Sequence, residues 1–134
     1  MVTIKNMKYI KTLRVIQVEG KCPSKGSRGS SLYSTKIRHS ATSGFKKPIK
    51  TDVGVEIDFF YKGVKTRPDI DNAEKLVLDS LKGVAFLDDK QVIDSRKKVH
   101  DTTVVMDFIN EPILLVNLLM EGTLEYTVIR IHEK

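Results

Sequence analysis

The alternation of apolar and polar residues predicts several β-strands. The strictest alternation runs over residues 53–60, where apolar side chains occupy every second position and lie on one side of an extended chain. The same period marks residues 12–18, 92–99, 102–109 and 124–131. The triplet Arg96-Lys97-Lys98 places cations on both faces of its strand, which a buried central strand would not tolerate. Residues 92–99 are therefore predicted to form an edge strand or a face laid on nucleic acid.

One segment has helical periodicity. Its apolar stripe is Ala73, Leu76, Val77, Ser80 and Leu81, with spacings of three and four residues typical of one helix face. Asp71 is the predicted N-cap, and Glu74 three positions later supplies the reciprocal partner of a capping box. Gly83 is suited to the left-handed residue that ends a helix. We expect a helix over about residues 71–82.

Three segments follow neither period. Residues 20–31 are rich in Gly, Ser, Lys and Arg, which predicts a loop able to track a phosphate backbone. Residues 32–50 contain many poor helix formers, so both a shortened helix around 32–40 and a long loop stay open. Residues 113–120 are too apolar for an exposed loop and are expected to be buried in the core or against a second subunit.

These elements predict an α/β (α+β) fold, with a small mixed sheet of about four to five strands, one main helix and up to two short ones. A chain of 134 residues is expected to be a single domain, 1–134. The lone Cys22 excludes an intrachain disulfide and favours a reducing compartment. No signal peptide is apparent, and residues 113–120 are far too short to span a bilayer. We expect a cytoplasmic protein that does not associate with membranes.

Charge is distributed unevenly along the chain. Residues 1–50 hold 12 Lys and Arg against the single Glu19, whereas residues 51–134 hold 11 against 16 acids. A polyanion would be attracted to the first half, so nucleic acid is the expected partner. The candidate DNA-binding residues are Lys21, Lys25, Arg28, Lys36, Arg38 and Arg67. Tyr33 is expected either to stack on a base or to cover the core.

Two acidic groups flank the predicted helix. Pro68 keeps the preceding chain extended, so Asp69 and Asp71 point to the same side, and Asp88 and Asp89 follow the far end. If these carboxylates converge, a divalent cation removes their repulsion. Because neither group contains His or Cys, the oxygen ligands suit Mg²⁺, or Mn²⁺ in its place, better than zinc. The alternative is that these residues only cap the helix and form turns.

Two further acids and one lysine have open roles. Glu56 and Asp58, on the polar face of the 53–60 strand, either reach the metal site or pair across strands. Lys75 is four residues after Asp71, so the two can form an ordinary ion pair along the helix. Alternatively, Lys75 can offset the carboxylates or stabilise negative charge in a transition state.

Several motifs around the helix match a known family. They are Arg67-Pro-Asp-Ile-Asp-Asn with Lys75, Leu78-Asp-Ser-Leu81, Gly83-Val-Ala-Phe and Asp88-Asp-Lys-Gln-Val92. These motifs resemble RusA-type Holliday junction resolvases, small metal-dependent endonucleases of phage and prophage origin. The resemblance is specific over about residues 66–98, is fainter over 12–33 around Pro23-Ser24-Lys25, and fails over roughly 108–122.

The resemblance implies that Asp69, Asp71 and Asp89 are catalytic carboxylates that bind Mg²⁺, that Lys75 is the basic residue at the active site, and that Asp88 is a secondary acid. It implies paired nicking of branched DNA in recombination and repair, without a small-molecule cofactor. Because a four-way junction has two-fold symmetry, two matched nicks require a homodimer of so small an enzyme. The alternatives are a non-catalytic DNA-binding protein and a general Mg²⁺ nuclease that acts on flaps or duplex.

Overall fold

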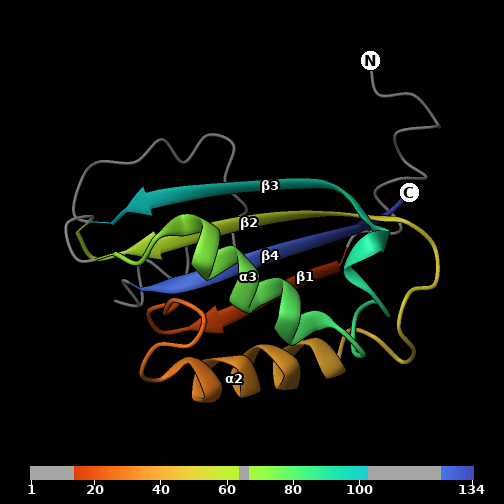
Figure 1. Ribbon diagram of the computed structural model, residues 1–134, viewed down its shortest axis with the longest axis horizontal. Coiled ribbons are helices and arrows are strands. Elements are labelled where there is room, and N and C mark those ends of the chain that lie inside the picture. Colours follow the sequence, from red (N-terminus) through yellow and green to blue (C-terminus); the bar gives the residue numbers. More distant parts are fainter. Residues whose placement is uncertain (1–13, 64–66, 103–124) are drawn as a thin grey trace.

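In a computed structural model, the chain forms a mixed β-sheet with two helices against one of its faces (Figure 1). The structure describes residues 14–63, 67–102 and 125–134. Within these ranges the elements are β1 (Arg14–Glu19), α2 (Ser30–Thr42), β2 (Val53–Tyr61), α3 (Ile70–Leu81), the 3₁₀ turn η1 (Asp89–Gln91), β3 (Val92–Asp101) and β4 (Tyr126–Glu133). The expected α+β fold is confirmed.

The order of the described strands is β1-β4-β2-β3. β4 pairs antiparallel with both β1 and β2, whereas β2 and β3 are parallel. Two neighbouring parallel strands need a crossover connection, and here the crossover contains α3. α3 therefore begins near the end of β2 and runs back along the sheet to the start of β3 (Figure 1). This unit positions both acidic groups.

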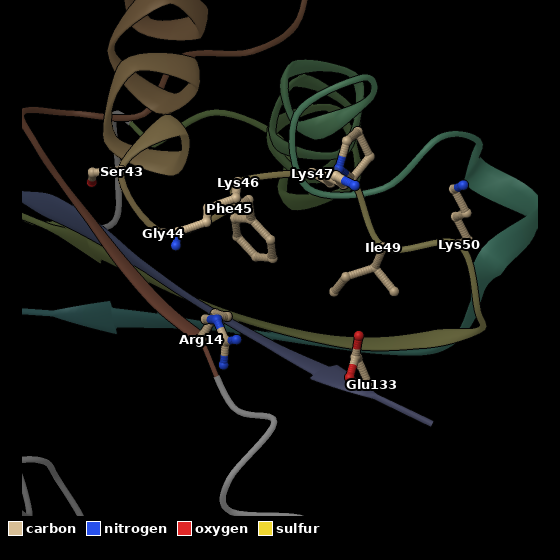
Figure 2. Close-up of a pocket in the computed structure, with 10 residues that line it drawn as sticks. Arg14, Ser43, Gly44, Phe45, Lys46, Lys47, Ile49, Lys50 and Glu133 are labelled. Atoms are coloured by element: carbon tan, nitrogen blue, oxygen red, sulfur yellow. The ribbon is translucent and has the colours of Figure 1, made fainter.

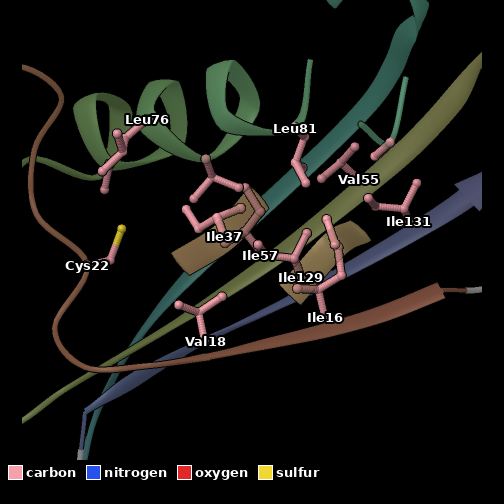
Figure 3. Close-up of a cluster of buried hydrophobic side chains, with 14 of the residues drawn as sticks. Ile16, Val18, Cys22, Ile37, Val55, Ile57, Leu76, Leu81, Ile129 and Ile131 are labelled. Atoms are coloured by element: carbon pink, nitrogen blue, oxygen red, sulfur yellow. The ribbon is translucent and has the colours of Figure 1, made fainter. Parts of the chain in front are cut away.

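The hydrophobic core lies between the sheet and the helices (Figure 3). Alternate residues of β2, beginning at Val53, are buried against the helical layer, as the period-2 pattern predicts. The buried residues of α3 are the predicted stripe: Ala73, Leu76, Val77, Ser80 and Leu81. Ile37 of α2 and Ile129 of β4 belong to the same core cluster (Figure 3).

The predicted N-cap of α3 is wrong by two residues, and the helix begins at Ile70. Asp69, not Asp71, is the N-cap, and its carboxylate accepts a hydrogen bond of 2.8 Å from the backbone N–H of Asp71. The expected capping box is absent, because Glu74 instead turns toward β3. The Asp69 carboxylate takes the free N–H of Asp71, the second helical residue, so the helix begins directly after Asp69. At the other end Gly83 has a φ of 79°, which confirms it as the left-handed stop.

α2 is longer than the sequence indicates. Of the two open alternatives, the helix is found and the long loop is not, and residues 30–42 extend it two residues beyond 32–40 at each end. Tyr33, Ile37 and Ala41 form a buried stripe at intervals of four residues, so packing on the sheet overrides poor helix propensity. The Tyr33 hydroxyl lies 2.8 Å from Thr127 Oγ1 and donates to the carbonyl of Gly20 at 3.0 Å. Tyr33 is thus a core residue.

β3 is one of the two edge strands of the described sheet, as the cations on both of its faces predict. The Arg96 side chain is 73% exposed. The strand expected over 102–109 lies outside the described residues except for Thr102, and so does the whole apolar segment 113–120. Neither described helix is long and apolar enough to cross a membrane.

Asp58 joins three strands on the sheet face away from the helices. Its carboxylate accepts hydrogen bonds from His100 Nε2 of β3 at 2.7 Å and from Arg130 Nη1 of β4 at 2.6 Å. Glu56 lies 3.7 Å from His132 on the same face. Both acids therefore pair across strands. Burial alone would raise the pKa of Asp58, but the hydrogen bonds from His100 and Arg130 outweigh it and hold that pKa below its ordinary value.

We predict that Asp58→Asn lowers the free energy of unfolding by about 1–3 kcal/mol at pH 7, because two half-buried donors lose a charged acceptor. A lowered native pKa means that the unfolded chain takes up the proton first, so wild type loses this stability as pH falls below about 4. Urea unfolding at pH 7 and pH 3 should show a smaller difference between the proteins in acid. The exposed Asp52→Asn serves as control, and an equal loss there would contradict the prediction.

Candidate active site

The first acidic group lies at the N-terminus of α3. Asp69 and Asp71 are both exposed, at the positive end of the helix dipole. Asp71 Oδ1 lies 2.7 Å from Lys97 Nζ, which extends from the neighbouring strand β3. This hydrogen bond and the positive charge of Lys97 hold the pKa of Asp71 below its ordinary value. Both carboxylates therefore present oxygen atoms to the solvent at this end of the helix.

Glu74 and Lys97 support this group, and the sequence did not single out either for that role. Glu74 accepts hydrogen bonds from Ser95 Oγ at 2.7 Å and from Lys97 Nζ at 2.9 Å. Lys97 therefore bridges Asp71 and Glu74, and their hydrogen bonds raise the pKa of its ammonium. The alternation of β3 could have indicated these contacts, because Ser95 and Lys97 share the strand face toward α3.

Lys75 is exposed one turn after Asp71. Asp71 pairs with Lys97 rather than with Lys75. The ion pair between Asp71 and Lys75 along the helix is therefore not found among the described contacts. Its charge still acts through space, since it contributes to the lowered pKa of Asp71. The ammonium of Lys75 is therefore free to approach a bound anion near Asp71.

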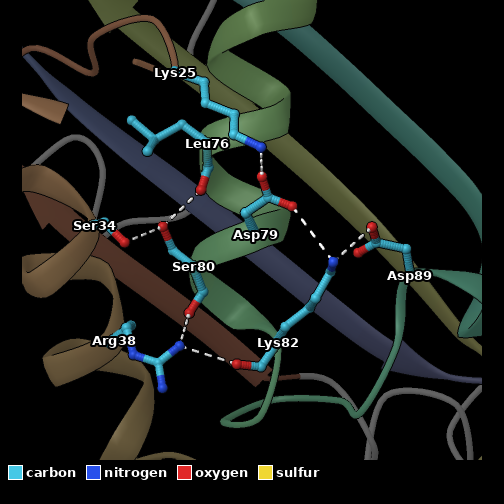
Figure 4. Close-up of polar contacts among 8 residues, drawn as sticks. All are labelled: Lys25, Ser34, Arg38, Leu76, Asp79, Ser80, Lys82 and Asp89. Carbon is cyan, nitrogen blue, oxygen red and sulfur yellow. Dashed lines mark hydrogen bonds and ion pairs between the residues drawn. The ribbon is translucent and has the colours of Figure 1, made fainter. Parts of the chain in front are cut away.

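The second acidic group lies at the opposite end of α3 (Figure 1). Asp89 is the first residue of η1, and its carboxylate is 3.2 Å from Lys82 Nζ at the helix C-cap. Lys82 also approaches Asp79 at 3.7 Å, which links Asp89 to the last turn of the helix (Figure 4). The hydrogen bond to Asp89 raises the pKa of Lys82.

Gln91 holds the turn that carries Asp88 and Asp89. Its side-chain oxygen accepts the backbone N–H of Leu87 at 2.8 Å and that of Asp88 at 3.0 Å. Its amide nitrogen donates to the carbonyls of Ile49 and Thr51 at 2.7 and 2.8 Å. One side chain therefore binds the acidic turn to the segment that precedes β2.

The two acidic groups do not meet within one chain. Asp71 contacts Lys97, five residues along β3 from Val92, and this corresponds to about 17 Å at ~3.3 Å per residue. Asp88 and Asp89 precede Val92 at the other end. Within the described ranges no three His, Cys, Asp or Glu side chains gather closely enough to hold a metal ion. The structure therefore brings Asp69 and Asp71 together but leaves Asp88 and Asp89 apart from them.

The candidate DNA-binding cations divide into two sets. Lys21, Arg28 and Lys36 line one groove, and Pro68, the residue before Asp69, lines it too. Lys36 Nζ also donates to the carbonyl of Glu19 at 3.1 Å. This groove opens beside the first acidic group, so a phosphate backbone that follows it passes Asp69.

The second set makes contacts within the fold. Lys25 forms an ion pair with Asp79. Arg38 Nη1 donates to the carbonyls of Ser80 and Lys82 at 3.1 and 3.0 Å, which satisfies the C-terminus of α3 (Figure 4). Arg67 Nη1 donates to the carbonyl of Pro68 at 3.2 Å and remains exposed. Arg38 thus has a structural role that the sequence did not indicate.

Carboxylate oxygens beside basic grooves are the groups that metal-assisted hydrolysis of nucleic acid requires. A family model described as Endodeoxyribonuclease RusA matches residues 24–106. The match covers more than half of the chain and includes both acidic groups, so the chain belongs to the RusA endodeoxyribonuclease family. No curated protein matches the chain.

We predict that Lys97→Gln raises the pKa of Asp71 toward its ordinary value, because the hydrogen bond and the charge of Lys97 cause the lowering. A carboxyl titration followed by NMR measures this pKa. Lys98→Gln is the matched control, since it removes the same charge from the opposite face of β3. Equal shifts in both variants, or no shift in Lys97→Gln, would show that Lys97 does not set the ionisation of Asp71.

Proposed function

We propose that this chain is a Mg²⁺-dependent endonuclease that resolves four-way DNA junctions by paired nicks, in recombination and repair in the cytoplasm. The family supports cleavage of DNA. The observation that carries the rest of the proposal is the placement of two acidic groups at opposite ends of one crossover helix. An enzyme that needs both groups at one phosphate must combine two copies of the chain.

A symmetric homodimer supplies that combination. In a two-fold interface, a contact from one residue to a second residue of the partner is always repeated in reverse. If Asp69 and Asp71 meet Asp88 and Asp89 of the partner subunit, symmetry creates a second identical site. Two sites related by a two-fold axis correspond to two matched nicks on a junction with the same symmetry.

The donor groups fit a hard divalent cation. All four proposed ligands are exposed carboxylates, without His or Cys, a set that suits Mg²⁺ and also Mn²⁺. Lys97 forms an ion pair with Asp71, and Lys82 forms one with Asp89. A positive charge therefore already lies beside each of the two acidic groups. When bound, the ion would lower the pKa of a water molecule and neutralise charge on the scissile phosphate.

The chain's own cations have separate tasks in this proposal. Lys75, which has no ion-pair partner among the described residues, stabilises the extra negative charge of the pentacovalent phosphorus. Lys97 stays attached to Glu74 after it leaves Asp71. Lys21, Arg28 and Lys36 hold backbone phosphates beside Asp69. Water attacks in line with the departing 3′ oxygen, and the product carries a 5′ phosphate.

We predict that Asp69→Asn, Asp71→Asn and Asp89→Asn each abolish cleavage of a mobile four-way junction, because each removes an anionic ligand. Junction binding should stay within about tenfold of wild type, since phosphate contacts provide most of the affinity. Cleavage with and without Mg²⁺ and gel-shift binding measure both effects. Equal nicking of linear duplex of the same sequence would identify a general nuclease, and binding without any cleavage a non-catalytic protein.

Mixing two inactive variants tests the shared site. In a heterodimer of Asp71→Asn with Asp89→Asn, one site carries both substitutions and the other carries neither. We therefore expect the mixture to recover single-strand nicking that neither variant shows alone. A mixture of Asp69→Asn with Asp71→Asn is the control, because every site then lacks one ligand. Recovery in both mixtures or in neither would overturn the shared arrangement.

A further inference from the structure

A second basic groove lies at the C-terminal end of α2, beside Ser43 and Gly44 (Figure 2). It has a volume of about 580 Å³, between the loop after α2 and the ends of β1 and β4. Its lining residues are Arg14, Ser43, Gly44, Phe45, Lys46, Lys47, Pro48, Ile49, Lys50 and Glu133. Four of these lining residues are cationic and one is acidic, a balance that favours an anionic ligand.

The lysines of this groove are available to a ligand. Lys46, Lys47 and Lys50 are all exposed, and none has an ion-pair partner among the described residues. Between them the loop is held in place, because Phe45 is only 8% exposed in the core and Pro48 restricts its own backbone. Several cations on a fixed loop repel one another, and an anion relieves that repulsion.

The groove is attached to the second acidic group. The N–H of Ile49 donates to the carbonyl of Ala85 at 2.8 Å. Gln91 donates to the carbonyls of Ile49 and Thr51, which flank Lys50, and accepts the N–H of Asp88. The residues on both sides of Lys50 are therefore hydrogen-bonded to Gln91, and Gln91 in turn holds the acidic turn. An anion bound in the groove has a defined position relative to Asp89.

We propose that Lys46, Lys47 and Lys50 bind the sugar-phosphate backbone of DNA and guide it to the acidic turn at Asp88 and Asp89. This proposal rests on the proposed function and adds a second backbone contact to it. Lys36 of the first groove and Ser43 of this one are seven residues apart, or about 10 Å along the helix axis, so the two grooves hold different phosphates. A DNA backbone, which presents charge at regular intervals, can occupy both.

The test compares junction binding by the full chain and by its Lys46→Ala/Lys47→Ala/Lys50→Ala variant. Binding is measured in EDTA over a range of NaCl concentrations. Each lost phosphate contact reduces the slope of log affinity against log salt by about 0.9, so we expect a reduction of about 2–3. Affinity near 0.15 M salt should fall by roughly 10- to 100-fold. Lys62→Ala/Lys134→Ala removes two exposed positive charges that line neither basic groove, and it should change the slope by less than about one contact.

The outcomes separate this proposal from the proposed function. Binding in EDTA requires no cleavage. A wild-type protein that binds the junction but never nicks it would therefore overturn the proposed endonuclease activity, whereas the salt slope would still test whether the groove binds DNA. If the salt slope of the groove variant is unchanged, or if both variants reduce the slope equally, the groove does not bind the DNA backbone. Thermal unfolding of the groove variant should match wild type, since all three lysines are exposed; a lower midpoint would attribute its weaker binding to the fold.

Discussion

The parallel pairing of β2 with β3 is the constraint on which the rest of the site depends. Parallel neighbours need a connection that returns the chain to the starting end of the sheet, and α3 provides it. Residues before α3 must then lie at one end of the sheet, and residues after it at the other. Because the motif places its acids on both sides of α3, one chain holds two half-sites instead of one complete site.

Ion pairs between neighbouring elements keep each half-site in position. Lys97 connects the first turn of α3 to β3, and Lys82 connects its last turn to η1. Both pairs are exposed, so they add little to stability. Their effect is mainly to hold the carboxylates beside a positive charge, and Lys97 also lowers the pKa of Asp71. The same positions can then accept a divalent cation at little structural cost, since each lysine can move on its flexible stem.

Basic residues serve two purposes in this fold, although they look alike in the sequence. Arg38 and Lys25 fasten α2 and its preceding loop to α3, whereas Lys21 and Arg28 line an open groove. Only the three-dimensional arrangement separates these roles, because an arginine on a helix surface meets whatever element packs beside it. Here α2 lies against α3, and the exposed carbonyls of the α3 C-terminus bind the guanidinium of Arg38.

The sequence by itself determined the elements whose signals are local: the alternation of β2, the buried stripe of α3, and the stop at Gly83. It also identified the acidic motif through its spacing. The tertiary structure alone decided that α2 is a full helix, since burial of Tyr33 against the sheet outweighs weak propensity. It also decided that Asp69 and Asp89 lie far apart, because strand pairing, which joins distant residues, sets the direction in which α3 runs.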